Sequence, residues 1–303
     1  MAITDFPYDN SEAEFMEMRQ FLIDTYAITR WPHNWLFARW EDWRYGGNAQ
    51  RAKADPEFFP RNAHVWRDET GKTVGFCVSE HGVGMHMQIH PSYRFVEREM
   101  IHWIVDEWAR DKEEVEVYAH SVDTRRQKLL RDAGFAEKGE VGNTHAYDLA
   151  RAYAPVPLPS SFSLMTLAEN RDFEAHLEAV RDVFAQPAIT HEWLESKRRA
   201  PSYSLDWDLV VVAPEGKHAS FCTAWLDHEN RIAAIDPVGT RADYRRRGLA
   251  TAVLTECFRR LRAAGMHCAY LDSAPEPHIS NRLYESLHPA ARYVERAWAK
   301  SLD

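Results

Sequence analysis

The strongest constraint on the fold is a proline-rich segment near the middle of the chain, "RAYAPVPLPSSFS" at 151–163. Pro155, Pro157 and Pro159 alternate with apolar residues there, and proline is excluded from helix interiors and from central strands. The segment therefore predicts an extended connector with a folded domain on each side. We expect a first domain at 1–152, a linker at 153–161 and a second domain at 162–303.

The two halves of the chain carry the same order of secondary-structure signals. In each half, helical patterns precede strand-like runs, a long helix, a strand, a shorter helix and a closing strand. Tyr93 corresponds to Tyr244, 151 positions later, and Leu130 corresponds to Tyr284, 154 positions later. Two offsets that agree this closely indicate a duplicated unit, and the alternative is that any two mixed domains share such a rhythm. The sequence predicts an α/β fold with a mixed sheet (α+β) in each of two tandem domains.

Composition excludes several classes of protein. The chain has 46 acidic and 37 basic residues and a formal net charge of -9 at pH 7, which argues against general binding to nucleic acid or to a membrane surface. No apolar run reaches the ~20 residues of a membrane span, and the first residues lack a signal-peptide pattern, so we expect a cytoplasmic protein. The four cysteines are far apart and are typical of buried thiols, so no disulfide or metal site is expected.

Against this acidic background, the basic segment "DYRRRGLATAVL" at 243–254 needs an explanation. It follows a strand-like run and opens a helical pattern that we expect to extend from Arg246 to Ala264. A helix start exposes unpaired N–H groups and the positive end of the dipole, so a pyrophosphate is a natural occupant. Gly248 lets the backbone approach the anion, and Ala250 is small. The segment matches neither G-x-G-x-x-G nor the ATP-binding P-loop, which disfavours nucleotide triphosphate hydrolysis.

The spacing Arg245-x-x-Gly248-x-Ala250, after a strand and at the start of an amphipathic helix, resembles the pyrophosphate loop of the GNAT superfamily of N-acetyltransferases. The resemblance covers both halves in element order, but the motif is intact only in the second half. It implies a degenerate first domain, a catalytic second domain, acetyl-CoA as co-substrate and no metal. The tandem arrangement is similar to mycothiol synthase, which acetylates a cysteinyl amine.

The resemblance also implies how the cofactor is held. The loop backbone would cradle the pyrophosphate, and the end of the preceding strand would pair with the pantetheine arm, with the Val238 N–H polarising the thioester carbonyl. The cofactor-binding residues implied in this way are Val238, Gly239, Thr240, Arg245, Arg246, Arg247, Gly248, Leu249, Ala250 and Thr251.

Two catalytic residues are expected in the second half. Tyr284 in "NRLYESL" matches the tyrosine that many family members place near the CoA sulfur, where it can protonate the departing thiolate. The alternative is an ordinary half-buried helix tyrosine. Ala234 stands where the family often has a glutamate, so Asp236, the nearest carboxylate, is the candidate general base. Asp272 and His278 are lesser candidates.

The first half has a different loop, "HPSYRFVEREM". Glu97 stands where Gly248 stands in the second half, and Glu99 stands where Ala250 does. Two carboxylates would repel a pyrophosphate, whereas glutamates early in a helix satisfy the helix end themselves. Leu130 replaces the tyrosine. We expect this domain to serve structure or to shape the substrate cleft.

A further unusual segment is rich in aromatic residues, "RWPHNWLFARWEDWRYGG" at 30–47. Trp35, Arg39 and Trp43 fall on one helical face. A packed core or an interdomain surface is the first interpretation, because aromatic residues chiefly bury area. The alternative is that some rings, with Glu41 or Asp42, reach the acceptor site and favour a cationic amine.

Together these patterns predict direct transfer of an acetyl group from acetyl-CoA to a primary amine of a small molecule, in the second domain. The expected partner is that amine acceptor, with no nucleic acid and no membrane. A mycothiol synthase-type reaction and an antibiotic amine are alternatives within the enzymes. A non-catalytic acyl-CoA sensor is the alternative from another class, and a basic site for RNA ends is a third.

Overall fold

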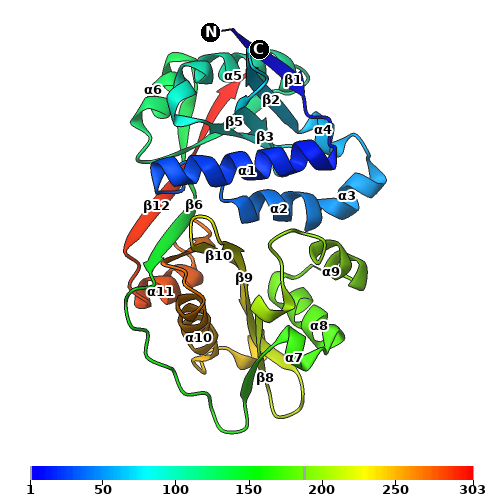
Figure 1. Ribbon diagram of the computed structural model, residues 1–303, viewed down its shortest axis with the longest axis vertical. Coiled ribbons are helices and arrows are strands. Elements are labelled where there is room, and N and C mark those ends of the chain that lie inside the picture. The colour runs from blue at the N-terminus through cyan, green and yellow to red at the C-terminus, as the bar shows by residue number, and fades with distance from the viewer. Residues whose placement is uncertain (1, 187–188, 303) are drawn as a thin grey trace. The chain divides into compact units, whose positions relative to one another are not determined.

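The computed structural model describes residues 2–186 and 189–302 (Figure 1). The chain divides into two compact units. Unit 1 comprises Met1–Asn143, Ala274–Glu276 and Tyr293–Asp303, and unit 2 comprises Thr144–Ser273 and Pro277–Arg292. The predicted linker lies in unit 2, without a helix or strand at 153–161.

Unit 1 is built on a mixed sheet with the strand order β1-β2-β3-β4-β5-β12. Its strands are β1 (Ile3–Pro7), β2 (Ala63–Asp68), β3 (Thr73–Val78), β4 (Gly84–Ile89), β5 (Glu114–His120) and β12 (Ala291–Ser301). Its helices are α1 (Glu12–Thr29), α2 (Phe37–Tyr45), α3 (Asn48–Ala54), α4 (Phe58–Arg61), α5 (Glu97–Trp103) and α6 (Thr124–Asp132), with a 3-10 turn at Pro91–Val96 and a π-helical turn at Ile104–Trp108. The β4 and β5 strands are parallel, and the neighbouring pairs are antiparallel.

The aromatic segment contributes buried rings to the core of unit 1. Trp40 and Trp43 of α2 stack at 4.7 Å, and Trp40 also stacks on Phe15 of α1 at 5.5 Å. Both indoles are buried. Glu41 is fully buried and accepts a 2.6 Å hydrogen bond from Arg19 Nε. The structure therefore agrees with the core interpretation, and Glu41 is occupied by an ion pair within this unit.

Unit 2 has the strand order β6-β11-β10-β9-β8-β7. Its strands are the end of β6 (Ala136–Asp148), β7 (Ser163–Thr166), β8 (Asp208–Val212), β9 (His218–Asp227), β10 (Ile232–Thr240) and β11 (Cys268–Ser273). Its helices are α7 (Leu167–Asn170), α8 (Phe173–Phe184), α9 (His191–Lys197), α10 (Leu249–Ala263) and α11 (Ile279–Ser286), with 3-10 turns at Leu205–Trp207 and Ala242–Tyr244. The β10 and β11 strands are parallel, so both units have the mixed α/β architecture that the sequence predicts.

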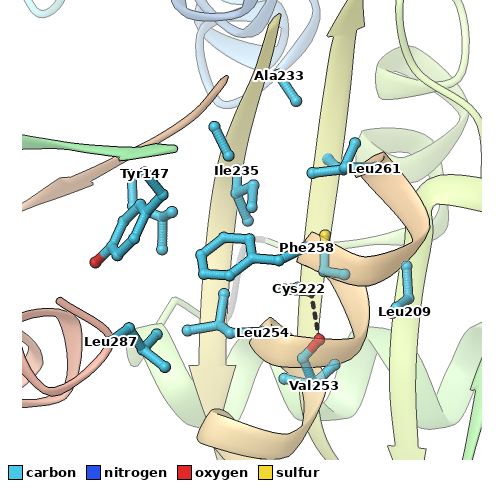
Figure 2. Packing of buried hydrophobic residues seen from close by; sticks show 14 of the residues in the cluster. Tyr147, Leu209, Cys222, Ala233, Ile235, Val253, Leu254, Phe258, Leu261 and Leu287 are labelled. Carbon is cyan, nitrogen blue, oxygen red and sulfur yellow. Dashed lines mark hydrogen bonds between the residues drawn. The ribbon is translucent and has the colours of Figure 1, made fainter. Parts of the chain in front are cut away.

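The β8 and β9 strands are buried on both faces, and their successive side chains point to opposite sides of the sheet. Leu209 and Cys222 face α10, where they pack with Val253, Phe258 and Leu261 (Figure 2). Neighbouring positions on β8 and β9 face the other layer and pack against α8 and α9, as the second cluster shows: Leu177, Val180, Leu194, Val210 and Phe221. This two-sided packing fixes the positions of β9 and β10, which carry the candidate site.

The closing strands are exchanged between the two halves of the sequence. β12 follows the elements of unit 2, yet it pairs antiparallel with β5, with Glu295 opposite His120 and Ser301 opposite Glu114. The end of β6, which follows α6 of the first half, lies next to β11 in unit 2. The observed units thus differ from the predicted ranges 1–152 and 162–303, because a periodic pattern indicates a strand but not its partner.

Candidate active site

The ladder between β10 and β11 is open at one end. Only Ile232–Ala234 of β10 pair with Cys268–Tyr270 of β11, although both strands continue beyond these residues. A bulge at Asp236–Pro237 shifts the register of β10 against β9 at this point. In a parallel sheet such an opening leaves a strand edge that can accept another extended chain.

The backbone of β10 presents donors to this opening. Arg241 N donates to Ala219 O at 3.0 Å, so these two residues form a hydrogen-bonded pair. This pair directly follows the pair of Thr240 and Ser220 in the ladder between β10 and β9. Because bonded and non-bonded pairs alternate in an antiparallel ladder, the N–H groups of Val238 and Thr240 face away from β9. They can therefore pair with a ligand that lies on the β11 side.

Gly239 has a packing role that the sequence did not reveal. A Cβ atom at this position would lie 2.5 Å from Phe221 Cζ and 2.8 Å from Val183 Cγ1 of α8. Only glycine lets β10 approach its neighbours this closely. The packing of β10 thus requires glycine here, independently of the predicted cofactor contact of Gly239.

The basic loop ends in an open helix terminus. Arg246 and Gly248 have φ values of 64° and 76°, so α10 begins at Leu249, later than the expected Arg246, because left-handed residues cannot continue a right-handed helix. Gly248 is the N-cap and supplies no side-chain hydrogen bond, and the first turn of α10 contains no acidic residue. A Cβ atom at Gly248 would meet no atom within 4 Å. The first turn of α10 thus has no side-chain cap from its N-cap residue, and the space beside Gly248 is open.

Two of the three arginines fold back onto the loop. Arg245 Nε donates to Thr240 O at 3.1 Å, and Arg247 Nη2 donates to Asp243 O at 3.1 Å. These bonds fix the loop to the end of β10, while all three side chains including Arg246 remain exposed. The loop therefore combines a fixed backbone with a local excess of positive charge.

The remaining predicted loop residues differ in exposure. Leu249 is buried in the core, so only its backbone can contact a ligand. Ala250 and Thr251 are partly exposed on the first turn of α10. Their small side chains leave the helix terminus accessible.

Tyr284 lies on α11 and is buried, with 6% of its surface exposed. Tyr147 Oη donates to the Tyr284 carbonyl at 2.9 Å and anchors the backbone there. Burial raises the pKa of Tyr284 well above its usual range, and the Asp236 and Asp272 carboxylates raise this pKa further. Tyr284 is therefore protonated at neutral pH, and the catalytic roles of Tyr284 and Asp236 stay predictions.

The three candidate bases have different environments. Asp236 lies exposed on the bulge of β10, and its carbonyl accepts a 2.6 Å hydrogen bond from Trp225 Nε1. Asp272 accepts a 2.6 Å bond from Thr144 Oγ1, and His278 is the N-cap of α11. Asp272 and His278 thus serve local structure. Sequence reasoning missed Trp225, because its bond to the bulge follows from the β9–β10 register and from no local motif.

Unit 1 has the same open ladder, and its own chain fills it. The β4 and β5 strands pair only at Gly84 and Met85. Asn34 Oδ1 accepts from Ile89 N at 2.9 Å, and Asn34 Nδ2 donates to Ile89 O at 3.1 Å. Ile89 corresponds to Thr240 at the offset of 151 positions. A side-chain amide thus makes both hydrogen bonds that an added strand would make.

Unit 1 has a buried carboxylate at the start of the corresponding helix, α5. Glu97, at the position of Gly248, is fully buried and accepts from Arg94 Nε at 2.9 Å and from Arg126 Nε at 2.9 Å. Asp123 accepts from Arg94 Nη2 at 2.8 Å. These ion pairs place an internal carboxylate where unit 2 has open space.

Residues 174–288 match the sequence model of the Acetyltransferase (GNAT) family. The matched residues lie almost entirely within unit 2. The resemblance predicted from the Arg245–Ala250 loop is thereby confirmed, and acyl transfer is the general chemistry of this family. A comparison with curated proteins finds no match for the chain.

Solved structures extend the GNAT fold to the whole chain. A GCN5-related N-acetyltransferase from Sphaerobacter thermophilus has a TM-score of 0.64 and 19% identity, over 99% of this chain and 97% of that chain. A tandem GNAT protein from the clavulanic acid biosynthesis pathway has a TM-score of 0.66 and 14% identity, over 99% and 98%. A GNAT-family acetyltransferase from Colwellia psychrerythraea has a TM-score of 0.63 and 12% identity, over 99% and 100%. The tandem GNAT fold is thus confirmed.

Two features are absent from the part of the chain that the structure describes. Among residues 2–186 and 189–302, no helix is long and apolar enough to cross a membrane. The same part of the chain contains no group of three or more His, Cys, Asp or Glu side chains that could hold a metal ion.

Proposed function

We propose that unit 2 transfers an acetyl group from acetyl-CoA to a primary amine of a small-molecule acceptor. The strongest support is that two features of the site follow each other directly along the chain. The open edge of β10 offers outward N–H groups to an extended amide chain, and it leads through the loop to the uncapped N-terminus of α10. A pantetheine arm that ends in a pyrophosphate fits both features.

The contacts of the co-substrate follow from the backbone. The N–H of Val238 would bind the thioester carbonyl and stabilise the oxyanion that forms when the amine attacks. The N–H of Thr240 would pair with an amide of the pantetheine arm. The N–H groups at Gly248 and in the first turn of α10 would bind the pyrophosphate, and the exposed arginines would balance its charge.

The proton transfers involve two side chains. As the amine attacks the acetyl carbon, the new C–N bond forms and the Asp236 carboxylate takes the amine proton, directly or through a water molecule. The C–S bond then breaks, and Tyr284 donates its proton to the departing sulfur. The raised pKa of Tyr284 keeps it in the acid form that this step needs.

The charge near Tyr284 favours a cationic acceptor. Asp236 and Asp272 are exposed carboxylates whose field reaches Tyr284. An acceptor that carries a second amine would be attracted to this pair. A cysteinyl amine, as in a mycothiol synthase-type reaction, and an antibiotic amine both belong in the panel of acceptors to be tested.

We further propose that unit 1 binds no acyl-CoA. The amide of Asn34 takes the hydrogen bonds of the strand edge, and the carboxylate of Glu97 takes the position of the anion. An incoming pantetheine pyrophosphate would have to displace both groups.

The test of the proposed function is the release of free thiol from acetyl-CoA in the presence of a panel of amines. We expect Tyr284→Phe to lower kcat by about 10²-fold, the lower end for the loss of a general acid. Because the pKa of Tyr284 is raised, its ionisation should cause no loss of activity up to about pH 10, the usual tyrosine value. Tyr147→Phe is the matched control, because it also removes a buried hydroxyl next to Tyr284 but leaves the Tyr284 hydroxyl in place.

A different result would support the alternative class. Acetyl-CoA binding without thiol release for every amine, unchanged by Tyr284→Phe, would identify unit 2 as an acyl-CoA sensor. An equal loss of kcat in the Tyr147 and Tyr284 variants would assign the effect to packing.

A further inference from the structure

Trp225 on β9 is bonded to the bulge that shapes the candidate site. Its Nε1 donates to the Asp236 carbonyl at 2.6 Å, and the indole is 1% exposed. The register between β9 and β10 shifts between Ile235 and Val238, and Pro237 has no N–H to offer to the ladder. A side-chain donor therefore ties the bulge to β9 where the backbone ladder is interrupted.

The indole of Trp225 contacts a buried cation, the ammonium group of Lys197. Lys197 of α9 is 1% exposed, and its Nζ lies 5.4 Å from the Trp225 ring, 5.2 Å from the Trp193 ring and 5.1 Å from the Tyr203 ring. Its Nζ also donates to Thr223 Oγ1 at 3.4 Å. A buried ammonium needs such compensation, and aromatic faces attract a desolvated cation strongly. Lys197 and the three rings form what we call the lysine cage.

A buried carboxylate fixes the far side of the lysine cage. Tyr203 Oη donates to Asp208 Oδ2 at 2.8 Å, and Asp208 is fully buried on β8. His176 Nε2 lies 3.8 Å from the same oxygen. The Tyr203 and Trp225 rings are 5.7 Å apart at 59°. The Tyr203 hydroxyl is bonded to Asp208, and the Trp225 ring contacts the Lys197 ammonium. Because both rings have a charged partner, the indole of Trp225 has little freedom to turn away from the bulge.

We infer that Trp225 is a positioning residue for the proposed acetyl transfer. Its indole N–H turns the Asp236 carbonyl toward β9, which fixes the bulge and aims the N–H of Val238 at the opening. Trp225 touches neither reactant. The inference rests on the proposed function for its consequence in catalysis, but the bond to the bulge can be tested without turnover.

The experiment compares two substitutions of the same kind in the same cage. Trp225→Phe removes the indole N–H that bonds to Asp236, whereas Trp193→Phe removes an indole of the cage that has no bond to the bulge. In the free protein, we expect amide hydrogen exchange at Gly239, whose N–H faces β9 in the alternation of bonded and non-bonded pairs, to be about tenfold faster in Trp225→Phe and changed less than about twofold in Trp193→Phe. Lys197→Met, which keeps the length of the side chain, should give a smaller increase at the same amide.

Turnover supplies the second readout. With acetyl-CoA and an active amine, kcat of Trp225→Phe should fall about tenfold, while the Kd for CoA, which is bound largely by the helix terminus, changes less than about twofold. Equal exchange in Trp225→Phe and wild type, or equal effects of the two tryptophan variants, overturns the inference whether or not turnover is seen. A wild-type protein that acetylates no amine overturns the proposed function instead.

Discussion

At the scale of single residues, Gly248 and Glu97 show how one substitution separates an open site from a filled one. Gly248 has a left-handed backbone and open space around it. Glu97, at the corresponding position, is buried and accepts hydrogen bonds from Arg94 and Arg126. The difference in charge between the two positions thus coincides with a difference in backbone geometry.

Gly248→Glu should therefore abolish acetyl-CoA binding and leave unit 2 folded. The new carboxylate would project into the space of the pyrophosphate, so we expect the Kd to rise on the order of 100-fold or more. Gly265→Glu is the matched control, because Gly265 follows the other end of α10, has a φ of 86° and also has no atom within 4 Å of a Cβ position. Both variants place a glutamate at a left-handed position next to α10, and calorimetric titration compares their binding of acetyl-CoA. Retained binding in Gly248→Glu would contradict the assignment of the loop.

The residues that sequence analysis found and missed differ in the range of their contacts. Gly248, Ala250 and Tyr284 belong to short patterns whose spacing is visible along the chain. Trp225 and Asn34 act by bonding to a backbone group 11 and 55 positions away. Strand register and the path of a loop determine these partners. Neither can be predicted from the pattern of a single sequence.

At the scale of secondary-structure elements, each of the two open ladders leaves an unpaired strand edge, and the two units differ in what lies against that edge. An unpaired strand edge presents N–H and C=O groups that need partners. In unit 1, Asn34 supplies both partners for Ile89 from within the chain. In unit 2, the outward N–H groups of Val238 and Thr240 face the opening. The order of elements in both halves could be predicted from the sequence. That Asn34 fills the opening in unit 1 is visible only in the structure.

This contrast predicts one acetyl-CoA site per chain. Calorimetric titration should give a stoichiometry of one, and Gly248→Glu should remove that site. Asn34→Ala should open no second site, because Glu97 remains, but it should lower the free energy of unfolding by about 1–3 kcal/mol, since two backbone groups of Ile89 lose their partners. Chemical denaturation measures that loss. A stoichiometry of two for the wild-type protein would show that unit 1 binds the co-substrate.

At the scale of the whole molecule, the exchange of closing strands ties each unit to both halves of the sequence. β12 pairs with β5 and contributes Trp298, 1% exposed, to the core of unit 1. Glu295 of the same strand lies 3.3 Å from His86 of β4. The sequence predicted two tandem α/β units correctly, but strand patterns alone could not assign β12 to unit 1.

Trp298→Ala should therefore destabilise unit 1, although its position follows the elements of unit 2. We expect a loss of about 3–5 kcal/mol, the usual cost of removing a buried tryptophan side chain. Hydrogen exchange should speed up in β5 at Glu114–His120, which pairs with β12, while α10 of unit 2 keeps its protection. Equal loss of protection in α10 would mean that the two units unfold together.

The pairing of β5 with β12 also orders events during synthesis on the ribosome. β5 leaves the exit tunnel long before β12 exists, so the nascent chain carries one bare strand edge in unit 1 while all of unit 2 is being made. Such an edge is a template for wrong pairing with other chains, and long-range strand pairs form slowly. A prematurely terminated product therefore lacks a finished first sheet and is exposed to proteolysis, so the stable molecule is the one translated through β12.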